Sequence, residues 1–275
     1  MRRALAAVAF FGASAIALAF LVLPLVALLT HRSPGTLISA LNNPVVGDAL
    51  LVSLKTSAIA QTLVILFGTP TAYLLATRRF RGRTLLLTLV ELPIVLPPAV
   101  AGIGLIVAFG RLGLAGGALS ALGIDVSFNA AAVVVAVMFV SGPLYVRFAV
   151  AAFGAVDGQL VAASRTLGAG SLRTFFRVVV PLAGGGLAAG AALALARGLG
   201  EFGATIMFAG SLQGVTQTLP LAIYAEFDNN LDVALSIAAL FVIITGAILL
   251  SLKLTSVWHS SRSDSRYRAA SFVSS

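Results

Sequence analysis

Six long apolar runs, separated by short polar segments, divide the sequence. They lie at about 4–30, 49–77, 84–110, 129–153, 178–200 and 233–254. Each run is long enough to cross a bilayer as an α-helix, which needs about 20 residues and satisfies its own backbone polar groups in lipid. The first run is about twice as long as the apolar region of a signal peptide, so we expect a retained helix. The pattern therefore predicts an all-α integral membrane protein with about six transmembrane helices.

Prolines interrupt the third of these runs. Pro93, Pro97 and Pro98 all lie within 84–110. Proline lacks a backbone N–H and clashes with the preceding helical turn, so we expect this helix to be kinked or broken. A broken helix at membrane depth is tolerated only where protein or water covers the freed backbone groups. Pro97 and Pro98 are therefore candidates for residues that line a pathway.

The composition supports a membrane protein and argues against several other classes. Hydrophobic residues make up 59% of the chain and charged residues only 10%, whereas soluble domains carry about 25% charged residues. The chain has no cysteine, so it has neither a disulfide framework nor a thiolate metal site. The formal net charge of +9 fits cationic loops on one side of a membrane, and we expect no nucleic-acid partner.

The charged residues also predict an orientation. If the chain crosses the membrane six times, thirteen cationic residues fall on one side and only Arg32 and Arg111 fall in the opposite loops. Cationic residues concentrate in cytoplasmic loops, so both termini are expected to be cytoplasmic. The thirteen are Arg2, Arg3, Arg78, Arg79, Arg81, Arg83, Arg165, Arg173, Arg177, Lys253, Arg262, Arg266 and Arg268.

The domain organisation is expected to be simple. Residues 1–258 contain all six apolar runs and form one predicted transmembrane domain. Residues 259–275 are polar and are predicted to form a disordered cytoplasmic tail. No loop is long enough to fold into a further domain.

The segment 158–181, between the fourth and fifth runs, is more structured than a simple connection requires. Leu160, Ala163 and Leu167 fall at helical spacing on one side of a predicted helix. Gly168 follows that helix at the position where a left-handed residue commonly ends a helix. Ser171 is then a candidate N-cap for a second helix. The pattern predicts a cytoplasmic helical loop with a glycine turn.

The second predicted helix of this loop is amphipathic and leads into the fifth apolar run. Arg173 and Arg177 stand one turn apart, away from its apolar stripe. This pattern fits either an interfacial helix whose arginines meet anionic lipid or a docking element for a cytoplasmic partner. The apolar stripe consists of Leu172, Phe175, Phe176 and Val179.

A family resemblance favours the docking element. The pattern Ala162-Ala163-Ser164-x3-Gly168-x9-Val178-x-Val180-Pro181 resembles the Glu-Ala-Ala-x3-Gly-x9-Ile-x-Leu-Pro loop of binding-protein-dependent ABC importer permeases. The spacing from Gly168 to Pro181 matches fully, whereas Ala162 replaces the usual glutamate and Ser164 the usual second alanine. In that family, this loop is a coupling helix that fits a groove in the ATP-binding subunit.

Two further stretches are similar to one branch of these permeases. Residues 91–116 and 196–224 look like the molybdate (ModB-like) branch, with the sulfate and thiosulfate permeases as close relatives. The resemblance covers roughly residues 50–250. It implies a permease for an oxyanion, with molybdate or tungstate as the leading cargo and sulfate or thiosulfate as the alternative.

The resemblance also implies partners and a location. The permease would form a homodimer around the translocation pathway in the cytoplasmic membrane of a bacterium or archaeon. Two copies of an ABC ATPase subunit would use ATP and Mg²⁺, and an extracytoplasmic oxyanion-binding protein would deliver the cargo. This chain itself would bind no cofactor. Its coupling residues would be Leu160, Ala162, Ala163, Ser164, Leu167, Gly168, Arg173 and Pro181.

Ionisable residues within a membrane span are costly and are candidates for function, and two pairs of them lie in or at the end of the predicted spans. Glu91 and Arg147 should lie at the same depth, and we expect them to form a buried pair rather than a gate. Arg197 and Glu201 are spaced i, i+4, which suits an ion pair on one helix.

The sequence offers no chemistry for ATP hydrolysis. It lacks the G-x4-G-K-[ST] phosphate-binding loop, and its two histidines have no metal-ligand partner, so we expect neither a catalytic residue nor a bound metal. A secondary carrier would be expected to show a two-repeat hydropathy pattern or an ion site at the membrane midplane. A membrane-embedded enzyme would need clustered acids, histidines or serines at a membrane face. Neither pattern is present.

Overall fold

The computed structural model describes the chain from residue 2 to residue 251, with side chains from residue 10 onward. Within this range the chain is helical and contains no strand. A final helix spans Leu231–Ser251. The helices that precede it are α1 (Arg2–Thr30), α2 (Pro34–Ala40), α3 (Pro44–Thr77), α4 (Arg83–Val95), α5 (Pro98–Phe109), α6 (Gly116–Ala121), α7 (Ala130–Gly154), α8 (Gly158–Thr166), α9 (Ser171–Thr174), the π-helix η1 (Phe175–Val179), α10 (Val180–Leu199), α11 (Gly203–Ala209) and α12 (Leu219–Asn229).

The six predicted runs correspond to helices that are long and apolar enough to cross a membrane. Five of them are continuous helical spans, and α4 together with α5 forms a sixth span that is bent by 117°. The all-α membrane fold is therefore confirmed. The fifth span starts earlier than predicted, because α9, η1 and α10 run together from Ser171 to Leu199. The predicted tail at 259–275 lies outside the described residues.

The break in the third span occurs at two of its three prolines. Pro93 lies inside α4 without ending it. Pro97 has an extended backbone, with φ −54° and ψ 135°, and Pro98 begins α5. A residue that precedes proline is pushed out of the helical region, so the Pro97-Pro98 pair stops one helix and starts another. The predicted kink or break is confirmed as a sharp bend.

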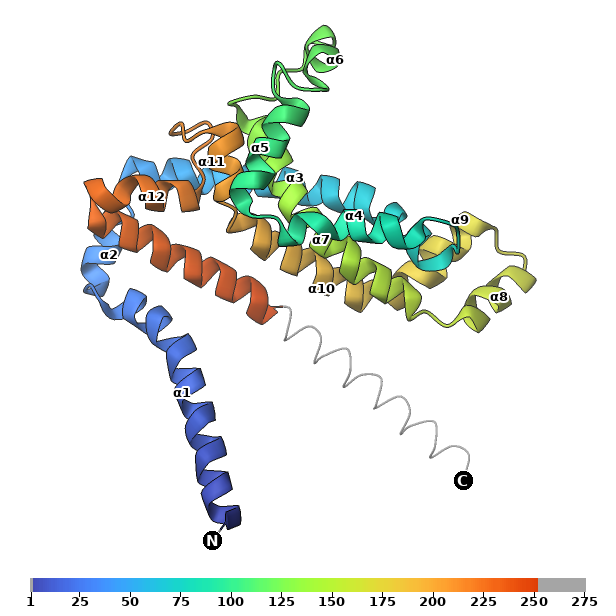
Figure 1. Cartoon of the computed structure of the whole chain (residues 1–275), viewed down its shortest axis with the longest axis horizontal. Helices are drawn as coiled ribbons and strands as arrows, with labels where there is room; N and C mark the ends of the chain where they lie inside the picture. Colours follow the sequence, from blue (N-terminus) through green and yellow to red (C-terminus); the bar gives the residue numbers. More distant parts are fainter. Residues whose placement is uncertain (1, 252–275) are drawn as a thin grey trace.

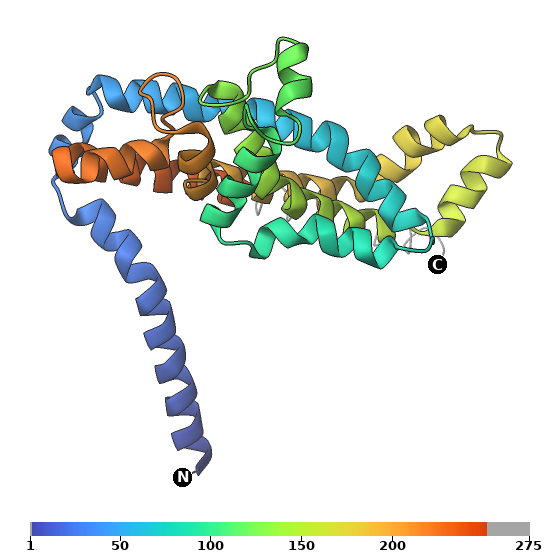
Figure 2. The same cartoon turned by 45° about the horizontal axis from the view of Figure 1, so that its top comes forward.

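The core of the fold is α7, which packs against α3 and α10 (Figure 1 and Figure 2). Glycines permit the close approach of these helices. A Cβ at Gly190 of α10 would lie 2.7 Å from the Cβ of Phe148, and one at Gly68 of α3 would lie 2.9 Å from the ring of Tyr145. A Cβ at Gly186 would lie 2.6 Å from that of Ala152. Gly186 and Gly190 therefore let α10 approach α7 closely.

Helix α1 stands apart from this core and extends away from it in both views (Figure 1 and Figure 2). None of the apolar window in Phe10–Thr30 is buried by the rest of the chain. A helix that is apolar on all sides must be covered by lipid or by other protein. Its apolar side chains are therefore available to lipid or to another subunit.

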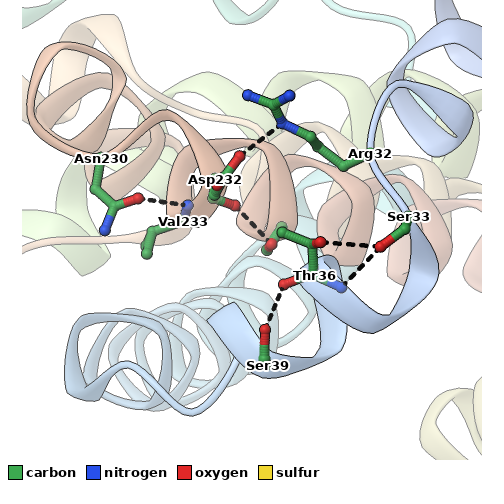
Figure 3. A network of polar contacts seen from close by, with 8 residues as sticks. Arg32, Ser33, Thr36, Ser39, Asn230, Asp232 and Val233 are labelled. Atoms are coloured by element: carbon green, nitrogen blue, oxygen red, sulfur yellow. Dashed lines mark hydrogen bonds and ion pairs between the residues drawn. The ribbon is translucent and has the colours of Figure 1, made fainter.

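A polar network anchors the end of α1 (Figure 3). Arg32 donates from Nε to Asp232 Oδ1 at 2.7 Å, which ties the α1–α2 junction to the start of the final helix. Ser33 caps α2 by accepting from the backbone N–H of Thr36 at 3.3 Å. Asn230 accepts from the backbone N–H of Val233 at 3.3 Å. The network fixes where α1 leaves the bundle.

The two ends of the bundle differ in charge. Helices α8 and α9 project from one end, beside the arginine-rich turn 78–83 between α3 and α4 (Figure 1 and Figure 2). Helices α2 and α12 lie at the other end, with Asp48 and the Arg32–Asp232 pair. This separation agrees with the charge pattern that predicted a cytoplasmic loop at 158–181. The orientation itself stays a prediction.

Candidate functional site

The candidate coupling loop begins with α8, whose two ends are capped. The Asp157 carboxylate accepts from the backbone N–H of Gln159 at 2.8 Å and caps the N-terminus. At the C-terminus, Gly168 has φ +83°, and its N–H donates to the Arg165 carbonyl at 3.0 Å. The N–H of Ala169 donates to the Ser164 carbonyl at 3.1 Å. This pair of bonds is a Schellman motif, which favours glycine at its left-handed position, so the predicted turn at Gly168 is confirmed.

Helix α8 has two different faces. Leu160, Ala163 and Leu167 are exposed, and Leu167 has 87% of its surface accessible. Gly158, Val161 and Arg165 recur at i, i+3 and i+7 on the opposite side and face the ends of α3 and α7. An apolar face that the chain does not cover is available for a partner. Ala162 is exposed as well.

The second half of the loop differs from the prediction at its start. Gly170, not Ser171, is the N-cap of α9, and it makes no side-chain cap bond. Ser171 is instead the first residue of the helix, because the chain leaves Gly168 through an extended Gly170 with ψ 164°. The prediction of Ser171 as N-cap is therefore wrong. The two halves are joined by the hydroxyls of Ser164 and the buried Thr174, which lie 3.0 Å apart.

The predicted apolar stripe of the second helix divides between two directions. Phe175 and Val179 pack in the core, whereas Leu172 and Phe176 are exposed. The cause is η1, a π-helical turn with i to i+5 bonds, which changes the angular spacing of side chains. Pro181 follows this turn and has no N–H to continue the α-helical pattern. Arg173 and Arg177 are exposed, as predicted.

An aromatic cluster attaches the loop to the bundle. The ring centroids of Tyr73 from α3 and Phe175 from η1 lie 4.8 Å apart. Phe153 from α7 lies 5.4 Å from Tyr73 and 6.1 Å from Phe175. Edge-to-face aromatic pairs of this kind contribute about 0.5–1.5 kcal/mol beyond their buried area. The loop is therefore anchored to α3 and α7 by packing.

A second candidate region surrounds the break at Pro97 and Pro98. A Cβ at Gly203, at the start of α11, would clash with the Cβ of Pro98. A Cβ at Gly102 of α5 would lie 2.6 Å from that of Met207 in α11. Helices α5 and α11 thus pack at glycines, and α11 covers one side of the broken span. Sequence reasoning missed Gly203, because its role depends on a contact with Pro98, which is distant in the sequence.

In the Arg197–Glu201 pair the glutamate is buried and the arginine is partly exposed, and the pair supports the start of α11. Arg197 Nη1 donates to Glu201 Oε2 at 2.8 Å, which confirms the predicted i, i+4 pair. Glu201 Oε1 accepts from the backbone N–H of Ala204 at 2.8 Å. The Glu201 side chain is only 1% exposed. This carboxylate therefore holds the segment between α10 and α11 in place.

The Glu91–Arg147 pair is of a different kind. The Arg147 Nε and Glu91 Oε1 atoms lie 3.8 Å apart, so the predicted proximity is confirmed. The side chains are 63% and 44% exposed for Arg147 and Glu91, so the prediction that the pair is buried is wrong within the single chain. The reason is that α4 lies at the edge of the bundle and has no buried residue. Lipid, water or a second subunit would cover this pair.

The comparisons with known proteins identify the family. Residues 65–257 match the family described as "Binding-protein-dependent transport system inner membrane component". The chain belongs to this family. The matched residues of this permease include the whole loop 158–181, the broken third span and both ion pairs of the spans.

Relatives of this permease cover most of its length. It is 43% identical over 235 residues to the "Molybdenum transport system permease protein ModB" of Mycobacterium tuberculosis, covering 85% of this chain and 88% of that protein. It is 37% identical over 247 residues to the "Probable transport system permease protein NifC" of Clostridium pasteurianum, covering 90% and 86%. A bacterial alginate ABC transporter in complex with its pentasaccharide-bound periplasmic protein contains a chain with the same fold, at a TM-score of 0.72 and 15% identity, covering 93% of this chain and 94% of that one.

The two carboxylates within the spans should respond differently to substitution. We expect Glu201→Gln to lower the thermal unfolding temperature of the detergent-solubilised protein clearly more than Glu91→Gln. Breaking a buried pair by removing one charge costs about 3–5 kcal/mol, whereas an exposed pair contributes about 0–1 kcal/mol. Both substitutions replace a carboxylate by an amide of nearly the same shape, so each variant is the control for the other. An equal loss in both variants, or a larger loss in Glu91→Gln, would contradict the assignment of Glu201 as the structural carboxylate.

Proposed function

We propose that this chain is the membrane-spanning subunit of an ABC importer that carries molybdate or tungstate. The cargo rests on the relatives that are 43% and 37% identical over most of the chain, the first of which is a molybdenum transport permease. Sulfate and thiosulfate are the competing cargoes. The fold supports a permease of this kind.

The observation that carries the proposed energy coupling is the exposed apolar face of α8. Helix α8 projects from the end of the bundle that has the arginine-rich turn 78–83 (Figure 1), and its residues Leu160 and Ala163, with Leu167 just after it, are exposed. We assign this face to a groove in an ABC ATPase subunit. Ala162 and Arg173 lie on exposed parts of the same loop, where they would meet the same partner.

The loop is suited to transmit force. Its outer face is free, whereas its inner side is fixed to α3 and α7 through Tyr73, Phe153 and Phe175. The Ser164–Thr174 contact holds α8 against α9. Gly168 sets the angle between the two halves, and Pro181 leads into α10. A movement of the ATPase subunit would thus reach the α3–α7–α10 core directly.

The proposed assembly has several subunits. A homodimer of this permease would enclose the pathway, with two ATPase subunits that bind ATP and Mg²⁺ and an extracytoplasmic oxyanion-binding protein. The uncovered α1 and the exposed α4 support an assembly larger than one chain. The complex would lie in the cytoplasmic membrane of a bacterium or archaeon. This chain would contribute no cofactor site, metal site or catalytic residue.

The pathway is proposed to run beside the broken third span. The bend at Pro97 and Pro98 leaves backbone groups without helical partners, and such groups are tolerated in membranes where they line a cavity. The exposed Arg147 of α7 would attract an anionic cargo. The negative charge of the nearby Glu91 would weaken that attraction, so that the anion is not held tightly. A moderate field of this kind favours passage over retention.

The cargo can be tested by uptake of radiolabelled molybdate. The complete importer would be expressed in cells that lack molybdate uptake of their own. We expect uptake that an equal concentration of tungstate reduces by about half, and that sulfate reduces only in large excess. Cells with the binding protein and ATPase but without this chain are the control. Equal competition by sulfate would shift the assignment to a sulfate permease, and absence of ATP-dependent uptake would contradict the proposed function.

The coupling role can be tested at Gly168. Its φ of +83° disfavours any side chain, whereas Gly170 has φ −66° and open space around it. Gly168→Val should cost roughly 1–2 kcal/mol locally, which is small against folding but enough to change the angle of α8. We expect normal membrane insertion, a steep loss of uptake and ATPase activity that no longer responds to loaded binding protein. Gly170→Val is the matched control and should retain most uptake.

Two outcomes would contradict the proposed role of the turn at Gly168. If Gly168→Val transported normally, the loop would be only a connector. If both valine variants lost uptake equally, the effect would come from added bulk rather than from the left-handed turn.

A further inference from the structure

A cavity of about 420 Å³ lies beneath α8, between its inner face and the ends of α3 and α7. The proposed function does not use it. Its walls combine apolar side chains with a small group of hydrogen-bonding and cationic residues. Those that matter for its chemistry are Tyr73, Thr77, Arg78, Gly158, Val161 and Arg165.

Two arginines from distant parts of the sequence meet at this cavity. Arg78 is the first residue after α3, and Arg165 lies in the last turn of α8. No carboxylate among residues 10–251 forms an ion pair with either of them. The nearest acid along the chain, Asp157, uses its carboxylate to cap the start of α8. The cavity is therefore lined by two arginines whose guanidinium groups have no ion-pair partner within the described part of the chain.

The neighbouring residues do not neutralise these charges. Arg79, Arg81 and Arg83 follow in the same turn and add to the positive potential. Arg83 is already engaged, because its Nε donates to the Leu75 carbonyl at 2.7 Å and so caps the end of α3. The Thr77 hydroxyl donates to the Tyr73 carbonyl at 2.8 Å. Among the lining residues, the side chains that have a hydrogen-bond donor and no hydrogen-bond partner within residues 10–251 are those of Arg78, Arg165 and Tyr73.

This donor set matches a tetrahedral oxyanion. Guanidinium groups bind phosphate oxygens through paired N–H donors. The rest of the wall, which includes Val161 and the residues of the bundle ends, is apolar. The cavity lies beside Thr77, where α3, a helix long and apolar enough to cross a membrane, ends. Basic pockets between transmembrane helices at the cytoplasmic surface are typical binding sites for anionic lipid headgroups.

We propose that this cavity binds a phosphate-type oxyanion that bridges Arg78 of the α3–α4 turn and Arg165 of α8. The group is either the phosphate of an anionic phospholipid or a free oxyanion from the aqueous phase. Either ligand would brace α8 against the bundle from its inner side and leave the outer face open. The inference is independent of the cargo that the importer carries.

The test measures hydrogen–deuterium exchange of the α8 amides in the full-length chain. The protein is reconstituted in nanodiscs of phosphatidylglycerol or of phosphatidylcholine, and the latter are measured with and without millimolar inorganic phosphate at constant ionic strength. If the ligand is a lipid, α8 should exchange several-fold more slowly in phosphatidylglycerol than in phosphatidylcholine, and added phosphate should not change its exchange in phosphatidylcholine. A free oxyanion predicts the same slowing in phosphatidylcholine only when phosphate is added.

A matched pair of double variants separates the site from general surface charge. Arg78→Gln with Arg165→Gln should abolish the slowing of exchange. Arg79→Gln with Arg81→Gln removes the same charge from residues that do not line the cavity and should preserve it. Loss of the slowing in both double variants would overturn the proposal. So would equal exchange of wild-type α8 in all three conditions, a result that does not depend on how the variants fold.

Discussion

The close packing of α7 against α3 and α10 is the constraint on which the rest of the structure depends. Lipid tails are as apolar as the helix surfaces, so burial of apolar area does not hold such helices together, and van der Waals contact must do so. Gly68, Gly186 and Gly190 make that contact possible because a Cβ at any of them would come within 3 Å of a side chain on α7. The aromatic cluster of Tyr73, Phe153 and Phe175 packs at the end of the same core and anchors the loop 158–181 to it.

The surfaces that this core leaves uncovered are as informative as those it buries. Helix α1 is bare on all sides, α4 has no buried residue, and the outer face of α8 points away from the bundle. A membrane-spanning chain that buries so little of these helices itself is suited to assembly with other subunits. In the proposed assembly, lipid and a second copy of the permease would cover α1 and α4, and an ATPase subunit would cover the outer face of α8. Glu201 and α11, in contrast, are fixed within the chain and act as structural support for the broken span.

Much of this organisation could be predicted from the sequence, because it depends on local signals. Six apolar runs, the Pro97-Pro98 break, the turn at Gly168 and the Arg197–Glu201 pair all follow from composition or spacing over a few residues. The cap at Gly170 and the split of the Phe175–Phe176 stripe were not predictable in this way, because η1 changes the helical period. Short helices such as α11 and α12 were missed because they depend on distant contacts, for example the 2.7 Å bond from the Leu219 N–H to Ser53 Oγ. The exposure of Glu91 depends on where α4 lies, which no local pattern encodes.

The most direct test of the account is the accessibility of α8 with and without the ATPase subunit. The chain has no cysteine, so Leu160→Cys, Ala163→Cys, Leu167→Cys and Val161→Cys each introduce a single reactive thiol. Labelling by a maleimide in inverted membrane vesicles would be compared between the permease alone and the complete importer. We expect the ATPase subunit to protect the three outer positions, while the half-buried Val161 position labels slowly in both samples. Unchanged labelling of the outer positions in the complete importer would contradict the assignment of this face as the coupling surface.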